Sequence, residues 1–115
     1  MAEVTMYHNP QCSKSRQTLA LLSEQGVEAN VVEYLQTPPD AKTLDAILQK
    51  LGLEPRELMR TKEDEYEALG LAEVTDRAQL IQAMVEHPIL IERPIVVKGN
   101  QARLGRPPEQ VLDIL

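Results

Sequence analysis

The chain has 115 residues, the length of one domain, and we expect a single domain over residues 1–115. Its 12 Lys and Arg against 18 Asp and Glu give a formal net charge of −6, which argues against nucleic-acid binding because that function needs basic surfaces. The sequence lacks both a membrane-length apolar run and a secretory leader, and its single cysteine, Cys12, fits a reducing cytosol. We therefore expect a cytoplasmic protein with no membrane or nucleic-acid partner.

The first third of the chain predicts a strand, a helix and a second strand. Residues 4–7 form a short β-prone run that ends at the turn signal His8-Asn9-Pro10. Residues 13–25 favour a helix with Leu19, Leu21 and Leu22 on its apolar side, and Gly26 suits the position after its last turn. Residues 27–34 then favour a strand.

The middle of the chain is helical in pattern. Asp40 can open a helix that carries an apolar stripe and ends at Gly52. Two short helices are expected at residues 55–59 and 63–69, and Asp76 with Gln79 resembles a capping box that opens a helix to residue 86. The apolar side chains of the two longer helices are Leu44, Ile47, Leu48 and Leu51 in the first and Leu80, Ile81, Met84 and Val85 in the second.

The last part predicts a β-hairpin and a final helix. Residues 95–97 and 102–104 flank Gly99-Asn100, a common hairpin turn. Pro107 and Pro108 suit the entry to a final helix that carries Val111, Leu112 and Leu115. A βαβ unit followed by helices, a hairpin and a helix predicts an α/β fold with a mixed sheet.

Cys12 is the first candidate for chemistry. It falls where the predicted first strand has ended and the helix begins, and a helix N-terminus favours an anion such as a thiolate. Arg16 lies one turn further on the same face and adds positive charge, while His8 can interact through the turn. Many lone cysteines are small buried apolar residues, but this position favours a reactive thiol.

Three arginines form the second candidate, because a guanidinium holds a tetrahedral oxyanion with two parallel donors. They are Arg60, Arg93 and Arg106, and spacing alone leaves open whether they converge or are separate surface charges. Arg93 precedes Pro94, for which a trans peptide bond is the default from the residues alone. The two histidines and one cysteine show no metal-site spacing, so no metal is expected.

The spacing of His8, Cys12 and Arg16 resembles the signature of the glutathione- and glutaredoxin-linked arsenate reductases of the thioredoxin fold. The resemblance spans essentially the whole chain. Other matching segments are Tyr7-His8-Asn9-Pro10, Tyr34-Leu35, Pro38-Pro39, Leu58-Met59-Arg60 and residues 69–72, 87–97, 103–108 and 111–115.

This resemblance implies a thioredoxin-like, glutaredoxin-like mixed sheet with a helical insert between the second and third strands. It implies reduction of arsenate to arsenite by a Cys12 nucleophile. Arg60, Arg93 and Arg106 would bind the oxyanion, and His8, Arg16 and a cis Pro94 would support the site. No bound cofactor is implied: glutathione is the external reductant, and glutaredoxin is the protein partner.

Two other functions are compatible with the residues. The segment Cys12-Ser13-Lys14-Ser15 resembles that of a shorter, arsenate-reductase-like subgroup, and the given sequence stops at Leu115 where arsenate reductases of this type tend to continue. A general glutathione-dependent thiol oxidoreductase would use Cys12 but need fewer of the arginines. A related group of Spx-type regulators binds RNA polymerase and commonly carries a CxxC switch. Here Ser15 stands where the second cysteine would be, which disfavours a disulfide switch.

Overall fold

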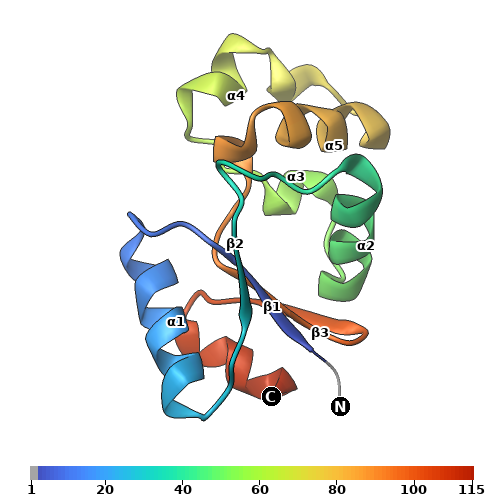
Figure 1. The fold of residues 1–115 in the computed structure, drawn as a ribbon. Coiled ribbons are helices and arrows are strands. Elements are labelled where there is room, and N and C mark those ends of the chain that lie inside the picture. Colours follow the sequence, from blue (N-terminus) through green and yellow to red (C-terminus); the bar gives the residue numbers. More distant parts are fainter. Residues whose placement is uncertain (1–2) are drawn as a thin grey trace. The chain divides into compact units, whose positions relative to one another are not determined.

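The computed structural model describes residues 3–115 and divides the chain into two compact units. The first unit runs to Thr37 and resumes at Arg93–Leu115, and the second is Pro38–Glu92. The elements of the first unit are β1 (Val4–His8), α1 (Ser13–Glu24), β2 (Asn30–Glu33), β3 (Ile95–Lys98), β4 (Gln101–Leu104) and the 3₁₀ helix η3 (Pro108–Ile114) (Figure 1). Those of the second are α2 (Ala41–Leu51), α3 (Pro55–Leu58), α4 (Asp64–Ala68), η1 (Leu71–Glu73), α5 (Arg77–Glu86) and η2 (Pro88–Leu90).

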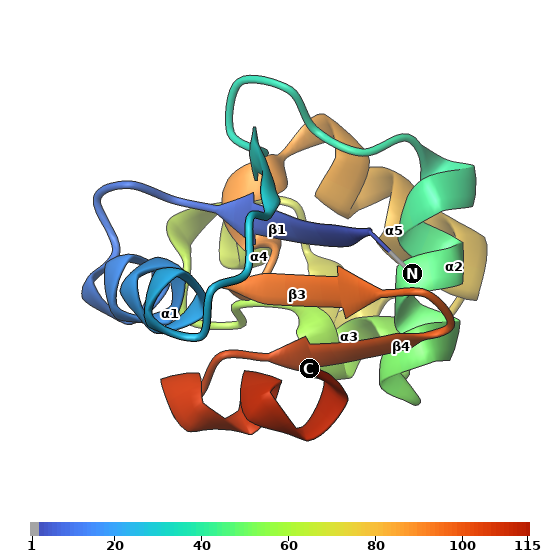
Figure 2. The ribbon, with the colours of Figure 1, turned by 60° about the horizontal axis from the view of Figure 1, so that its bottom comes forward.

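The first unit is built on a four-stranded mixed sheet, with the strand order β2-β1-β3-β4 among the described residues. β1 runs parallel to β2 and antiparallel to β3, and β3 and β4 form the hairpin (Figure 2). Gly99 lies in the hairpin turn with φ 60°, a conformation that glycine adopts without steric cost. The predicted α/β fold, with its helical insert between the second and third strands, is confirmed.

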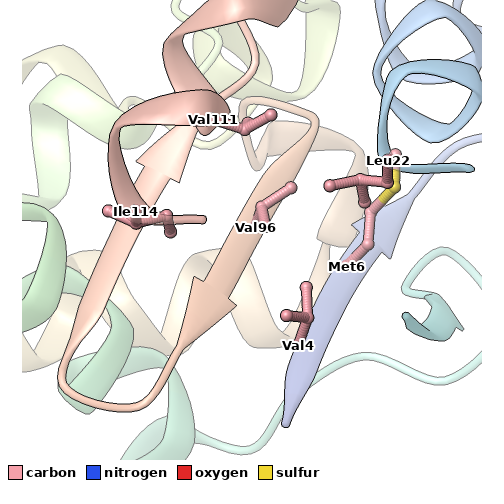
Figure 3. Packing of buried hydrophobic residues seen from close by; sticks show 6 residues of the cluster. All are labelled: Val4, Met6, Leu22, Val96, Val111 and Ile114. Carbon is pink, nitrogen blue, oxygen red and sulfur yellow. The ribbon is translucent and has the colours of Figure 1, made fainter. Parts of the chain in front are cut away.

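The core of this unit lies on one face of the sheet. Met6 of β1 pairs with Val96 of β3, and both are fully buried. Leu22 of α1 packs on this face, as do Val111 and Ile114 of η3 (Figure 3). Because side chains alternate along a strand, His8 points to the same face as Met6 and therefore towards α1.

The final helix differs from the expected one. It is a 3₁₀ helix with three residues per turn, so Pro108, Val111 and Ile114 share its buried face. Leu112, which the predicted helix also carries, is 40% exposed. The buried side chains of this helix recur every three residues, as its 3₁₀ period requires.

The second strand is shorter than predicted. β2 covers Asn30–Glu33, and the ladder with β1 begins at Thr5 and Asn30. Val27 and Ala29 instead pack their side chains against the core as the chain leaves α1. Their apolar character reflects burial rather than membership of the ladder.

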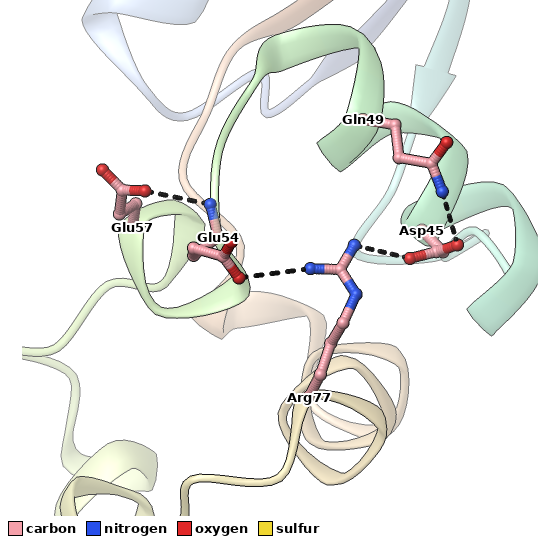
Figure 4. Close-up of polar contacts among 5 residues, drawn as sticks. All are labelled: Asp45, Gln49, Glu54, Glu57 and Arg77. Carbon is pink, nitrogen blue, oxygen red and sulfur yellow. Dashed lines mark hydrogen bonds and ion pairs between the residues drawn. The ribbon is translucent and has the colours of Figure 1, made fainter.

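In the second unit, the predicted N-caps Asp40 and Asp76 and the predicted end of α2 at Gly52 are confirmed. Asp40 accepts a hydrogen bond from Thr43 N–H at 2.7 Å, Gly52 ends α2 with φ 71°, and Asp76 accepts from Gln79 N–H at 3.1 Å. The expected apolar side chains Leu44, Ile47, Leu48, Leu80, Ile81 and Met84 are buried, whereas Leu51 and Val85 are only partly buried. Arg77 of α5 forms ion pairs with Asp45 of α2 and Glu54 beside α3 (Figure 4).

Arg56 ties the short helices of this unit together, a role that the sequence analysis missed. Its guanidinium donates to the Tyr66 hydroxyl and to the Leu71 and Val74 carbonyl oxygens. These partners lie in α4, in η1 and just after η1. Among residues 3–115, no helix is both long and apolar enough to span a bilayer.

The backbone of Gly105 lies close to α1 and to Pro94. It follows β4, and its N–H donates to the Pro94 carbonyl at 2.9 Å. A Cβ at this position would lie 2.4 Å from Thr18 Oγ1 and 2.6 Å from Pro94 Cγ. Thr18 is buried in α1, and its hydroxyl donates to the Lys14 carbonyl. Only glycine therefore lets this segment lie against both α1 and Pro94.

We predict that Gly105→Ala lowers the free energy of unfolding by about 1–3 kcal/mol, because the added methyl group overpacks the contact with Thr18 and Pro94. Urea unfolding followed by circular dichroism measures the change. Thr18→Ala removes Thr18 Oγ1, the atom nearest to the added methyl group. The loss of unfolding free energy in the Gly105→Ala/Thr18→Ala double variant should therefore be smaller than the sum of the losses in the two single variants. A Gly105→Ala midpoint equal to that of the wild type contradicts the prediction.

Candidate active site

Cys12 is the N-cap residue of α1, in an extended backbone conformation with φ −94° and ψ 124°. The preceding turn is held by its own polar groups. The Cys12 N–H donates to the Asn9 carbonyl, and the Gln11 N–H donates to Asn9 Oδ1, each at 3.0 Å. The Cys12 side chain makes no capping hydrogen bond and is only 9% exposed. The sulfur is thus held at the start of the helix, as the sequence predicted.

His8 and Ser15 form a buried polar pair beneath this turn. His8 Nδ1 lies 2.6 Å from Ser15 Oγ, and the Asn9 N–H also donates to Ser15 Oγ at 3.0 Å. Burial lowers the pKa of His8 from its usual 6.5, and the charge of Arg16 adds to this, whereas Glu33 opposes it. Burial therefore favours the neutral form of His8, whose Nδ1 shares a hydrogen bond with the Ser15 hydroxyl.

Arg106 reaches Cys12 from the other end of the sequence. Arg106 Nη2 lies 3.8 Å from Cys12 Sγ, although the two residues are 94 positions apart. Arg106 Nε donates to the Arg93 carbonyl at 2.7 Å, which fixes the guanidinium at its inner end. The Arg93–Pro94 peptide bond is cis, as the resemblance implied, and so is Arg106–Pro107, which was not predicted. The structure thereby brings together Cys12, Arg106 and the backbone of Arg93.

Arg16 also lies near this turn, but its observed contact is structural. Its Nη1 donates to the Pro10 carbonyl at 3.0 Å, across the turn that precedes Cys12. The backbone N–H of Arg16 donates to the Cys12 carbonyl and so closes the first turn of α1. Arg16 therefore braces the turn that carries the sulfur and places a positive charge on it.

Arg60 belongs to the second unit, and its surroundings there are well defined. Its N–H donates to the Leu90 carbonyl at 2.7 Å, which places it beside η2. Its Nη1 pairs with Glu63 at 2.6 Å, and its Nε lies 3.8 Å from Glu92.

The sequence analysis missed Ser15 as a residue of the site. The buried residues of α1 are Ser15, Thr18 and Leu22, which follow the three- and four-residue spacing of one helix face. The prediction placed Leu19 and Leu21 on the apolar side of this helix, but both are only partly buried. In residues 3–115, no group of three or more His, Cys, Asp or Glu side chains is placed to hold a metal ion.

The lowered pKa of His8 predicts a pH dependence of stability. The unfolded chain binds a proton near pH 6.5 and the folded chain only at lower pH, so the free energy of unfolding should fall as the pH drops from 7 towards 5. His8→Asn should flatten this slope in urea unfolding measured across that range. His87→Gln, at the only other histidine, is the control for the loss of a histidine, and the flattening is expected for the His8 variant. An equal slope in the His8 variant and the wild type would refute the assignment.

The sequence matches the ArsC family over residues 7–114. It is 59% identical over 115 residues to the Escherichia coli K12 protein YfgD, across 98% of this chain and 97% of that protein. It is 48% identical over 114 residues to an arsenate reductase of Haemophilus influenzae, across 97% of this chain and 98% of that protein. The solved structure of an arsenate reductase from Vibrio cholerae is 54% identical, has a TM-score of 0.95, and is matched over 99% of this chain and 98% of its own. With the family match and these full-length relatives in agreement, the chain belongs to the ArsC family.

Proposed function

We propose that this chain reduces arsenate to arsenite, with Cys12 as the nucleophile. The observation that carries the proposal is the placement of the Arg106 guanidinium 3.8 Å from the Cys12 sulfur, at the N-terminus of α1. A cation and a helix N-terminus both stabilise a thiolate, and both also attract an oxyanion. Relatives that match this chain over nearly their full length are named arsenate reductases, which supports arsenate as the substrate.

A thiolate that attacks an oxyanion meets electrostatic repulsion, which guanidinium groups offset. Arg106 is held by the hydrogen bond from its Nε to the Arg93 carbonyl, and its Nη2 lies beside the sulfur that would attack the oxyanion. The first N–H groups of α1 provide further donors at the same point. We assign Arg93 and Arg60 as the other oxyanion ligands, on the resemblance of their sequence segments to those of the arsenate reductases.

The electron count requires a second thiol. Attack of the Cys12 thiolate forms a sulfur–arsenic bond and displaces one arsenate oxygen as water. Glutathione then attacks the Cys12 sulfur, and the electron pair of the sulfur–arsenic bond stays on arsenic, which becomes arsenite. The two electrons come from the two sulfurs, which end as a Cys12–glutathione disulfide.

Regeneration of Cys12 needs a second exchange. Cys12 is the only cysteine of the chain, so the mixed disulfide must be cleaved from outside, and glutaredoxin is the proposed partner. Ser15 occupies the position of the second cysteine of a CxxC pair and is buried against His8. The cytoplasm, where glutathione is abundant, is the proposed location.

We predict no catalytic turnover of arsenate without an added thiol, and restored turnover with glutathione and glutaredoxin. Arsenite formation measures the rate, and mass spectrometry should find one glutathione on the wild type and none on Cys12→Ser. Repeated turnover with no external reductant refutes this mechanism, because the chain has no other thiol to supply the second electron. Glutathione-dependent disulfide reduction without arsenate turnover would instead indicate a general thiol oxidoreductase.

We predict that Arg106→Lys lowers the rate of arsenate reduction on the order of 10²-fold. Lysine keeps the charge, but its single ammonium group cannot bond both the Arg93 carbonyl and the sulfur as the guanidinium does. Arg103→Lys on β4 makes the same chemical change at a residue that pairs with Asp113, and it should keep near-normal turnover. Equal rates in the two folded variants would exclude Arg106 from the site.

A further inference from the structure

Arg60 is engaged by carboxylates in the ligand-free protein. Glu63 Oε1 lies 2.6 Å from Arg60 Nη1, and Glu92 Oε1 lies 3.8 Å from Arg60 Nε. All three side chains are about one-quarter exposed, and they line a surface pocket of about 270 Å³ together with Met59, Thr61 and Lys62. Two of the three guanidinium nitrogens of Arg60, Nη1 and Nε, are therefore already paired with anionic oxygens of the protein.

The position of Glu63 makes this pairing informative. Glu63 is the N-cap residue of α4, where a carboxylate could accept a hydrogen bond from the first helical N–H groups. Its side chain makes no capping bond and is directed to Arg60 instead. The Glu63 N–H donates to the Arg60 carbonyl at 3.1 Å, so this turn is also held by the backbone without the side-chain pair.

We propose that Glu63 is an internal competitor for the oxyanion at Arg60, and that it sets the affinity of the protein for arsenate. This inference rests on the proposed function, in which Arg60 binds the oxyanion. Each bidentate edge of the guanidinium that includes Nη1 is open to an oxyanion only after the Glu63 carboxylate has been displaced from Nη1. Arsenite is uncharged at neutral pH, so Glu63 can pair with Arg60 again once the oxyanion has been reduced.

The displacement precedes the chemical step and is complete in both the bound ground state and the transition state. Removing the competitor should therefore change substrate binding and leave the chemical step unaltered. The Arg60–Glu63 pair is partly exposed, and pairs of this kind contribute modestly, so we expect an effect of about two- to five-fold.

The test measures sulfate binding by titration calorimetry at low ionic strength, because sulfate is a tetrahedral oxyanion that thiols do not reduce under these conditions. Glu63→Gln should tighten sulfate binding by about two- to five-fold and lower the arsenate KM by a similar factor, with kcat unchanged. Glu63→Asp keeps the charge on a shorter side chain, and it should likewise tighten sulfate binding and lower the arsenate KM. Glu67→Gln makes the matched charge change on an exposed residue of α4 and should alter neither quantity.

The effect should also depend on Arg60. In an Arg60→Gln background, Glu63→Gln should produce no further tightening, because the competed group is gone. Sulfate binding that is unchanged or weaker in Glu63→Gln would overturn the inference and leave the pair a structural contact. Failure of the wild type to reduce arsenate with glutathione and glutaredoxin would instead overturn the proposed function, whatever the sulfate titration shows.

Discussion

The close approach of the Gly105 backbone to α1 and to Pro94 is the constraint on which the first unit's site depends. Thr18 Oγ1 and Pro94 Cγ lie close to the position that a Cβ on residue 105 would occupy. Because glycine has no Cβ, the segment that follows β4 can lie directly against α1. Arg106 is the next residue, and this contact brings its guanidinium to the Cys12 sulfur. The hydrogen bond from Gly105 N–H to the Pro94 carbonyl and that from Arg106 Nε to the Arg93 carbonyl join the same two segments. Packing at a glycine therefore decides which charge faces the thiol.

A second set of contacts fixes the other side of Cys12. The alternation of β1 turns His8 towards α1, where the Ser15 hydroxyl meets it, and the Asn9 N–H bonds the same oxygen. Buried polar groups need partners, and here each partner belongs to the turn or to the helix that the turn precedes. The neutral His8 is part of this arrangement, because a buried charge at that position would lack the solvation it has in water.

The distribution of charge around the arginines contrasts with the chain as a whole. The net charge is −6, yet the thiol lies at a helix N-terminus beside a guanidinium. In the second unit, Arg60 is balanced by nearby carboxylates, whereas Arg56 is used to hold short helices together through carbonyl and hydroxyl oxygens. Arginine thus has three different roles in one small protein, and its partners distinguish them.

The local features of the chain could be derived from its residues, since caps, turns and apolar periods act over a few positions. Asp40, Asp76, Gly52 and the Gly99 turn mark the element boundaries that the structure shows, and the helix start at Cys12 follows from the same reasoning. The residues alone did not decide whether the last helix is an α-helix or a 3₁₀ helix, because its apolar pattern fits both periods. Residues 108–114 formed a 3₁₀ helix because the core is filled by every third side chain.

The contacts of the site required the tertiary structure. Nothing local to Arg106 specifies Cys12 as its neighbour, because the two lie 94 positions apart and meet through the packing of Gly105 on α1. Ser15 was not predicted as a site residue, because a serine in a helix is usually exposed. Its burial follows from its contact with His8, which lies on the neighbouring strand. The residues by themselves determined most of the elements, the single thiol and its place at a helix start, since each depends on near neighbours. Only tertiary packing decided which arginine meets that thiol and which carboxylates meet Arg60, because those distances are set by surfaces brought together from distant parts of the sequence.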